Sequence, residues 1–148
     1  DLPMTGPAGR VLDEPIDVAA ETVRVTAVSM GNPHVVFFAD PVTDAIIDRL
    51  GPPLEVHPAF PRRTNVHAVQ VHGPAELTML TWERGAGRTL ACGTGACAVG
   101  VAAALNGHTG RVTTIHLKGG DLTIEWADDN HVYMTGPATT VYTGSMPL

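Results

Sequence analysis

A cysteine followed by Gly93-Thr94-Gly95 is the residue of this chain whose setting most favours chemistry. Cys92 stands just before a predicted helix over 94–106, where backbone N–H groups are unpaired and carry a partial positive charge. That setting is expected to lower the pKa of the thiol and to supply thiolate near neutral pH. Because glycine has no Cβ, the same amides could approach a bound carboxylate closely. The segment could therefore combine a reactive thiol with an anion site.

Two charged residues, Glu83 and Arg84, lead into the same glycine-rich loop. A carboxylate can hold or accept a thiol proton, and a guanidinium can form a forked contact with a substrate carboxylate. A small buried cysteine beside a solvated charge pair is the structural alternative. The combination favours proton-transfer chemistry at Cys92.

Four stretches carry a resemblance to a known family. The run E-R-G-A-G-R-T-L-A-C-G-T-G-A-C at 83–97 resembles the signature of diaminopimelate epimerase. Three more stretches match in family order: S-M-G-N-P-H at 29–34, F-P-R-R-T-N-V at 60–66 and Y-M-T-G-P-A at 133–138. The C-G-T-G run alone is shared with proline racemase-like enzymes, so specificity comes from the four stretches together. The resemblance implies a cofactor-independent isomerase of lysine and cell-wall biosynthesis, which interconverts LL- and meso-diaminopimelate.

The resemblance also implies roles for single residues. Cys92 is expected to be one of two proton-transfer cysteines, with Glu83 beside it. Asn32 and Asn65 match positions that bind the amino and carboxylate groups of the substrate, and Arg84 matches a carboxylate contact. Taken alone, either asparagine would be read as a turn residue.

Three further assignments complete the predicted site. His34 matches the histidine that neighbours the catalytic cysteine of the first half in the family. The amides of Gly93 and Thr94 are our hypothesis for the group that holds the α-carboxylate. Because Cys97 follows Cys92 by five residues, it would point away from the facing half and cannot be the second proton-transfer thiol.

Epimerisation at an α-carbon needs a base on one face and an acid on the other. Without pyridoxal phosphate, the protein itself must stabilise the carbanion in a dry, preorganised cleft. The sequence offers no G-x-G-x-x-G motif and no lysine in a Schiff-base context, and its other histidines lack metal-ligand spacing. We therefore expect no cofactor and no metal.

Composition excludes several classes of protein. The net charge is −6 and Lys118 is the single lysine, which argues against nucleic-acid binding. Hydrophobic residues make up 44% of the chain, as in a globular protein, yet no apolar run approaches the roughly 18 residues of a membrane span. Cys92 and Cys97 are poorly placed for a disulfide, which favours a reduced, cytoplasmic protein.

The chain does not begin with methionine and matches the second of two similar family halves, so we expect a fragment. Residues 1–138 would form the C-terminal catalytic half-domain. Residues 139–148 would contain a strand that pairs with the missing N-terminal half of the same protein. The expected partners are therefore diaminopimelate and that half, and the sequence leaves a homodimer open.

The elements that must position the site follow from hydrophobic pattern and turn residues. Residues 1–20 are Pro- and Gly-rich and predict an extended approach segment. A helix is expected over 41–50, capped by Asp40 and closed at Gly51-Pro52. The expected strands are 21–28, 35–39, 64–71, 76–83, 111–117, 121–126, 131–135 and 139–143.

The helix over 94–106 contains no charged residue, so it should be surrounded on all sides. Many short strands around one buried helix predict an α+β domain, a barrel-like, mostly antiparallel sheet curled about that helix. The resemblance implies the same fold, used twice, with the active site between the halves.

Three other functions stay open. A proline racemase-like or phenazine-type isomerase of the same fold would lack the E-R-G-A-G approach to the cysteine. In a non-catalytic ligand-binding domain, Cys92 would be inert. A thiol hydrolase would need a histidine base, and none lies near Cys92 in the sequence.

Overall fold

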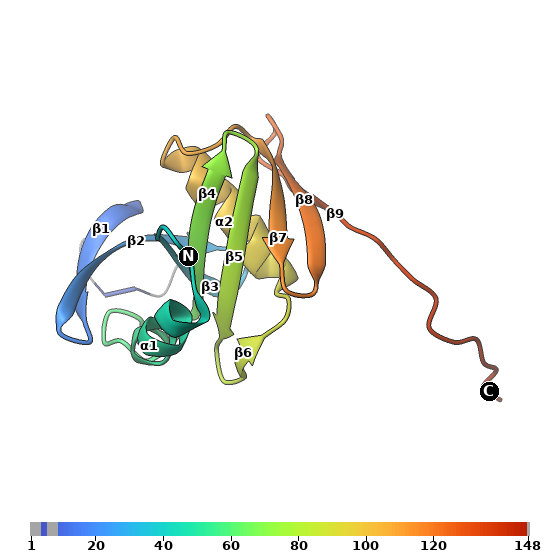
Figure 1. Cartoon of the computed structure of the whole chain (residues 1–148), viewed down its shortest axis with the longest axis horizontal. Helices are drawn as coiled ribbons and strands as arrows, with labels where there is room; N and C mark the ends of the chain where they lie inside the picture. The colour runs from blue at the N-terminus through green and yellow to red at the C-terminus, as the bar shows by residue number, and fades with distance from the viewer. Residues whose placement is uncertain (1–3, 6–8, 148) are drawn as a thin grey trace.

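A curled sheet surrounds one helix in the computed structural model, which describes residues 4–5 and 9–147 (Figure 1). The strand order is β1-β2-β3-β4-β5-β7-β8-β9, with β6 paired to β5. Among the strands of the described residues, β3–β4 and β5–β7 run parallel and the other pairs run antiparallel. The elements are β1 (Val11–Val18), β2 (Glu21–Ser29), β3 (Pro33–Phe38), α1 (Asp44–Glu55), β4 (Asn65–Gly73), β5 (Glu76–Glu83), β6 (Gly87–Thr89), α2 (Gly93–Leu105), β7 (Val112–Leu117), β8 (Gly120–Trp126) and β9 (Val132–Thr135).

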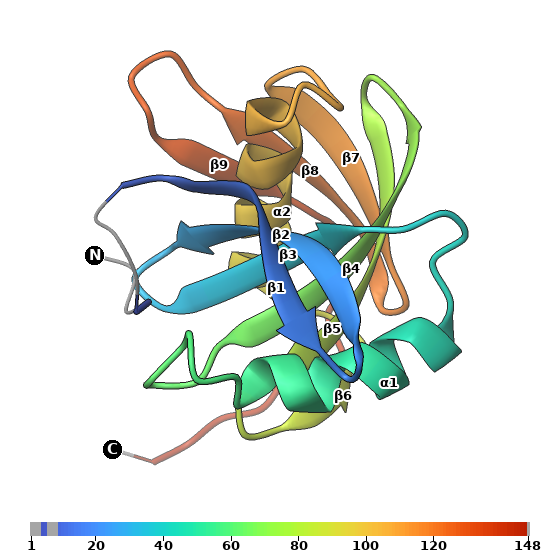
Figure 2. The ribbon, with the colours of Figure 1, turned by 90° about the vertical axis from the view of Figure 1, so that its left-hand side faces the viewer.

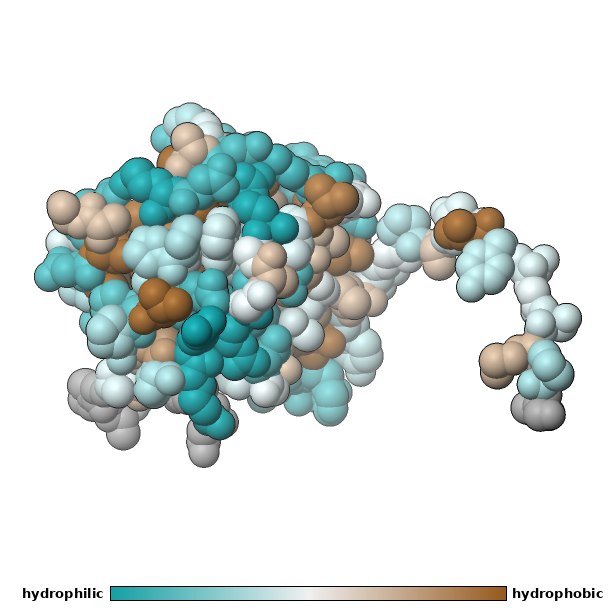
Figure 3. Space-filling view, turned by 90° about the horizontal axis from the view of Figure 1, so that it is seen from below, coloured by the Kyte–Doolittle hydropathy of each residue, from teal (hydrophilic) through white to brown (hydrophobic). Residues whose placement is uncertain are grey.

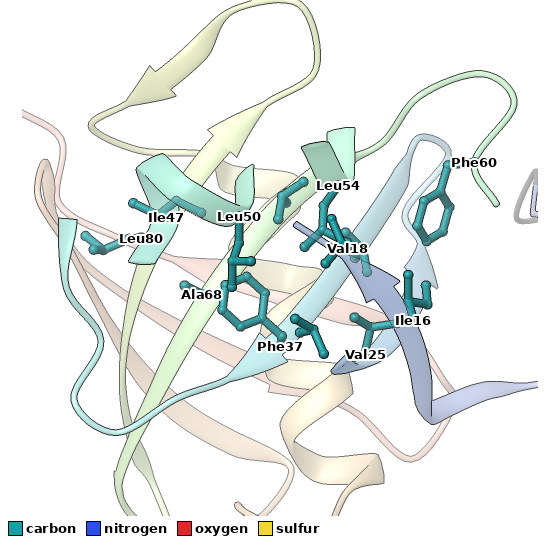
Figure 4. Close-up of a cluster of buried hydrophobic side chains, with 13 residues drawn as sticks. Ile16, Val18, Val25, Phe37, Ile47, Leu50, Leu54, Phe60, Ala68 and Leu80 are labelled. Atoms are coloured by element: carbon teal, nitrogen blue, oxygen red, sulfur yellow. The ribbon is translucent and has the colours of Figure 1, made fainter. Parts of the chain in front are cut away.

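The central strands β3 and β4 are buried on both faces, because a helix covers each face. Successive side chains of a strand point to opposite faces, so Val35 and Phe37 pack in the cluster that contains the α1 side chains. Val36 and Val69 pack in the second cluster, with α2. Figure 4 shows the first cluster, with Phe37 between the strands and Leu50 of α1. The predicted two-sided burial of 35–39 is confirmed.

Helix α2 is buried as its uncharged sequence predicts. It contacts β2, β3, β4, β5, β7, β8 and β9, and the sheet curls around it without closing (Figure 2). Gly100 permits a close approach of β8, because a Cβ there would lie 2.7 Å from the Ile124 Cγ2 atom. The predicted α+β class and buried central helix are confirmed.

Helix α1 differs from the prediction at both ends. Its N-cap is Thr43, whose hydroxyl accepts a hydrogen bond from the Ile46 N–H at 3.3 Å; the predicted Asp40 cap is wrong. The helix also continues through Pro52 and Pro53 to Glu55. The two prolines remove two N–H donors from the helix, while Leu54, which follows them, is fully buried in the cluster that α1 covers. Packing therefore overrides the local breaker signal.

Strand β1 was not predicted: the Pro- and Gly-rich sequence of residues 1–20 predicts an extended approach segment, whereas Val11–Val18 form a strand. The register shifts between Val11 and Glu14, and Asp13 has a φ of 52°, so a bulge disturbs the alternation. Beyond the bulge, Ile16 and Val18 point inward. The predicted approach segment also includes residues 1–3 and 6–8, which lie outside the described residues.

The remaining predicted strands agree with the structure within about two residues, apart from the last. Residues 136–147 form no strand within this chain, so the expected strand over 139–143 does not pair with the described sheet. Val141 is 90% exposed and Tyr142 84%, and the segment stands away from the body (Figures 1 and 3). Pairing of this segment with another half stays a prediction. No helix in the described part of the chain is long and apolar enough to cross a membrane.

Candidate active site

Cys92 is the N-cap residue of α2. Its backbone is extended, with φ −142° and ψ 102°, and its carbonyl accepts the Ala96 N–H at 2.8 Å. The residue is only 8% exposed. It follows the short strand β6, which was not predicted, and the helix begins at Gly93, one residue earlier than expected. The predicted position of Cys92 at a helix start is confirmed.

The first turn of α2 supplies hydrogen-bond donors around the sulfur. Thr94 is exposed, and its Oγ1 lies 3.9 Å from the Cys92 Sγ. Beside them, a Cβ at Gly93 would lie 3.3 Å from the Met134 side chain, so β9 borders this turn. The helix start is therefore open beside Thr94 and covered beside Gly93.

The thiol is more basic than the sequence predicts. Burial raises the pKa of Cys92 above 9.0, and the Glu83 carboxylate raises it further. Hydrogen bonds from the Gly95 N–H and the Thr94 hydroxyl lower the pKa but do not reverse the shift. The expectation of thiolate near neutral pH is therefore wrong for this chain, because desolvation disfavours the charged form. At pH 7 Cys92 is a protonated thiol, able to donate a proton.

Glu83 ends β5 and pairs with Gly87 of β6 across a tight turn. The turn is fixed by Glu55, a residue that the sequence analysis did not select. Its Oε1 accepts the Gly85 N–H at 2.9 Å, and its Oε2 accepts the Trp82 indole N–H at 2.8 Å. Glu55 thus sets the course of the chain into the Cys92 loop.

Glu55 keeps its charge although it is only 8% exposed. Burial acts to raise its pKa, but the bonds from Trp82 and Gly85 and the charge of Arg63 hold the pKa below its usual value. No sequence motif marks this residue. Glu55 reaches this turn because α1 extends past Pro52 and Pro53.

Asn65 and Arg84 lie next to each other. The Asn65 Oδ1 accepts the Arg84 backbone N–H at 3.0 Å, and its Nδ2 donates to the Pro33 carbonyl at 2.9 Å. Asn65 is 5% exposed, and the exposed Arg84 donates from Nη1 to the Arg62 carbonyl at 3.2 Å. In this chain Asn65 therefore joins β3 to the turn that carries Arg84. Substrate contact by either residue stays a prediction.

A second cluster joins the G-N-P-H turn to the helix start. Asn32 Nδ2 donates to Thr94 Oγ1 at 3.4 Å, and Asn32 Oδ1 lies 2.9 Å from His34 Nε2. The other ring nitrogen of His34 lies 2.9 Å from His67 Nε2, and His67 Nδ1 lies 3.1 Å from Thr81 Oγ1. Both histidines are fully buried. His34 therefore has ordered partners within this chain.

Both histidines are neutral at pH 7. Burial, aided by the Arg84 guanidinium, lowers the pKa of His34 from 6.5 to about 4. Burial and then His34 lower the pKa of His67 well below 6.5. No motif in the sequence marks His67 as a site residue. Its position on the face that also carries Val69, in a strand buried on both sides, was the signal that could have selected it.

Cys97, on α2 itself, is a half-buried side chain that packs against the second apolar cluster. Both cysteines are free, as predicted. Burial raises the pKa of the Cys97 thiol too. Within the described residues, no three metal-ligating side chains come together.

The structure thus brings five of the predicted residues into one region. Hydrogen bonds link Cys92, Thr94, Asn32 and His34, and Glu83 acts on Cys92 through its charge. A buried thiol, a nearby carboxylate and a donor-rich helix start can transfer a proton to or from one side of a bound carbon acid.

Comparison with known proteins agrees with this geometry. The family profile described as Diaminopimelate epimerase matches residues 26–141. A protein named diaminopimelate epimerase from Moorella thermoacetica is 60% identical, and the match covers 99% of this chain and 53% of that protein. A protein of the same name from Pelotomaculum thermopropionicum is 56% identical over 99% of this chain and 52% of its own length. The chain spans about half the length of the curated relatives it matches.

A solved structure shares the fold at low sequence identity. The Bacillus anthracis phenazine biosynthesis protein of the PhzF family superposes with a TM-score of 0.54 and 21% identity, over 82% of this chain and 40% of that one. At this identity the likeness concerns the fold alone.

Proposed function

The chain belongs to the diaminopimelate epimerase family, and from this premise we propose that it is the C-terminal half of an enzyme that interconverts LL- and meso-diaminopimelate. The observation that supports this most is the position of Cys92. It lies inside the matched region, at the N-cap of a buried helix and beside Glu83. The chemistry needed is proton transfer at an α-carbon.

Cys92 supplies one of two proton-transfer groups. In one direction, a thiolate of the missing half removes the α-proton, and the Cys92 S–H donates its proton to the opposite face of the carbanion. Cys92 is then a thiolate, and the other cysteine is a thiol; the reverse reaction exchanges their roles. The raised pKa of Cys92 suits the donor state. Glu83, beside the sulfur, disfavours the thiolate and so favours return of the proton.

Hydrogen-bond donors of this chain bind the negatively charged carboxylate of the substrate. The amides of Gly93 and Thr94 at the helix start hold the α-carboxylate, and Arg84 adds a charge-assisted bond. Asn32 and Asn65 contact the amino and carboxylate groups. These donors spread the developing negative charge in place of a cofactor, so the reaction is independent of pyridoxal phosphate and of metal.

The missing half supplies the second wall of the cleft. Residues 139–148 pair as a strand with that half; among them Val141 and Tyr142 are exposed here. Open apolar strand segments pair readily with another chain, so a homodimer through the same segment is a second assembly. The enzyme acts in the cytoplasm, where its thiols stay reduced.

The test is a complementation assay. The chain alone, and the chain mixed with the separately expressed first half of the Moorella thermoacetica relative, are assayed for deuterium uptake at the α-carbon and for LL-to-meso conversion. We expect no conversion by the chain alone, because one acid–base group worth roughly 10²–10⁴ in rate is absent. Conversion is expected in the mixture.

Matched variants assign the thiol. Cys92→Ala should abolish conversion by the mixture, whereas Cys97→Ala, on the same helix, should leave most of it. Robust conversion by the chain alone would contradict the two-half mechanism. Full activity of the Cys92→Ala mixture would contradict the role of Cys92.

A further inference from the structure

The hydrogen bonds of the buried histidine cluster all run in one direction. The Asn32 Oδ1 can only accept, so His34 Nε2 must donate to it across 2.9 Å. A neutral His34 then has an unprotonated Nδ1, which must accept from His67 Nε2 at 2.9 Å. Both rings are fully buried, which keeps them neutral. The geometry therefore fixes one tautomer for each histidine.

The hydrogen bonds at both ends of the cluster run from donor to acceptor in the same direction. With Nε2 protonated, His67 Nδ1 accepts from the Thr81 hydroxyl at 3.1 Å. At the other end Asn32 Nδ2 donates to Thr94 Oγ1 at 3.4 Å. This contact leaves the Thr94 hydroxyl hydrogen free to point to the Cys92 Sγ, 3.9 Å away. Every donor in the series points toward the sulfur.

We propose that His67 is a positioning residue for Cys92: acting through His34 and Asn32, it orients the Thr94 hydroxyl to donate to the Cys92 sulfur. The proposal rests on the proposed role of Cys92 in proton transfer. Hydrogen bonds in series polarise one another, most strongly in the low-dielectric interior where His34 and His67 lie. A donor fixed on the sulfur stabilises the thiolate when the proton leaves.

The packing around His67 leaves room for this ring. A Cβ at Gly95 would clash with the His67 Cε1 atom, and it would lie 2.9 Å from Nε2 and 3.0 Å from the Cys92 Sγ. The glycine of the helix start thus lets the ring reach the level of the sulfur. His67 does not bond to Cys92 itself, because both of its ring nitrogens are engaged elsewhere. It acts only through the series.

Other groups that act on the sulfur or on the histidines are constant in the tests below. Glu83, at the end of β5, raises the pKa of Cys92, and Cys97 lies on the same helix. The Arg84 guanidinium lowers the pKa of His34. Glu83 and Arg84 are unaltered in the variants, and Cys97 is replaced by alanine in the parent and in both variants alike, so a difference in thiol ionisation between them reports on the hydrogen-bond series.

The first experiment reads the tautomers directly. Long-range ¹H–¹⁵N NMR correlation of the ring nitrogens, on the whole chain at pH 7, should show Nε2–H and unprotonated Nδ1 for both His34 and His67. An Nδ1–H tautomer at either ring would overturn the proposal. This measurement needs no substrate and no variant.

The second experiment measures ionisation of the thiol. In a Cys97→Ala background, the rate of Cys92 alkylation is followed against pH for His67→Leu and His67→Gln. The glutamine amide places a donor where His67 has Nε2, so His67→Gln should match the parent. His67→Leu fills the space without a donor and should slow alkylation about three- to tenfold at a pH below the thiol pKa.

The two variants separate positioning from packing. Thermal unfolding is recorded for each, so that the comparison uses folded protein. Equal alkylation profiles for His67→Leu and the parent would overturn the proposal, and so would a glutamine variant as slow as the leucine variant. If the chain proves not to take part in epimerisation, only the proposed function fails, because the tautomers and the thiol ionisation are measured without it.

Discussion

Acidification should destabilise this chain between pH 6.5 and about 4, because two neutral histidines are buried in it. The pKa of His34 falls from 6.5 to about 4 on folding. Within that window the unfolded chain binds a proton that the folded chain does not, so the free energy of unfolding falls as the pH falls. Stability from this source is fully present above pH 6.5.

The magnitude follows from the shift. At roughly 1.4 kcal/mol for each tenfold change in proton affinity, a fall from 6.5 to about 4 corresponds to about 3 kcal/mol. His67 adds to the loss in the same direction, since its pKa is lowered as well. Domains of this size are stable by about 5–15 kcal/mol. The loss is therefore a large part of the total.

One histidine acts in the opposite sense. Hydrogen bonds that the His116 ring donates to the Asp121 and Glu76 carboxylates raise the pKa of His116, so its contribution is present below pH 6.5 and is lost as the pH rises. The side chain is partly exposed, and solvent weakens this term. A His116→Gln background removes it from the measurement.

The assay is urea unfolding at several pH values between 7 and 4.5, above the range where most carboxylates titrate. The control is the double variant His34→Gln, His67→Gln, whose unfolding free energy should stay nearly flat over the same range. A parent chain that keeps its stability at pH 4.5 would refute the reasoning. An equal loss in the double variant would refute it too.

Three further results are expected. Gly100→Ala should cost about 1–3 kcal/mol in urea unfolding, because its Cβ would lie 2.7 Å from Ile124 Cγ2; an equal cost in an Ile124→Ala background would contradict this cause. A chain that ends at Ala138 should unfold within about 0.5 kcal/mol of the parent, because the exposed segment buries little; a larger loss would show that the segment packs on the body. Alkylation followed by peptide mapping should label both cysteines slowly at neutral pH and faster at alkaline pH, since burial raises both thiol pKa values; rapid labelling of Cys92 at neutral pH would contradict the raised pKa.

The parts of the fold that the sequence predicts well are those where burial alone decides. The uncharged run of α2 can only lie inside, and the apolar run of β3 can only lie between two layers. Strand β5 was predicted with its observed bounds, Glu76–Glu83, because turn residues flank a strongly patterned segment. In each of these segments, local pattern and tertiary packing agree.

The differences arise where tertiary contacts override local signals. Pro52 and Pro53 predict the end of a helix, yet α1 continues to Glu55, whose carboxylate holds the turn before the Cys92 loop. A bulge at Asp13 hides the period of β1.

The sequence predicts where Cys92 lies better than it predicts the ionisation of its thiol. The motif places Cys92 at the helix start, as the structure has it. A motif does not say how deeply a thiol is buried, and burial reversed the expected direction of its pKa shift. Nor could spacing reveal His67, whose ring meets His34 because β3 and β4 run parallel, with His34 opposite Asn65 and His67 opposite Val36.

The composition of α2 also bears on the order of folding. The helix has glycine at three of its 13 positions and no charged pair to support it, so it is a poor helix in isolation. Its contacts include β2, far upstream, and β8, downstream. Substitutions in α2 should therefore speed unfolding more than they slow folding, as for an element that forms after the transition state. During synthesis the Cys92 thiol would then stay open to oxidants until the last strands have closed around the helix.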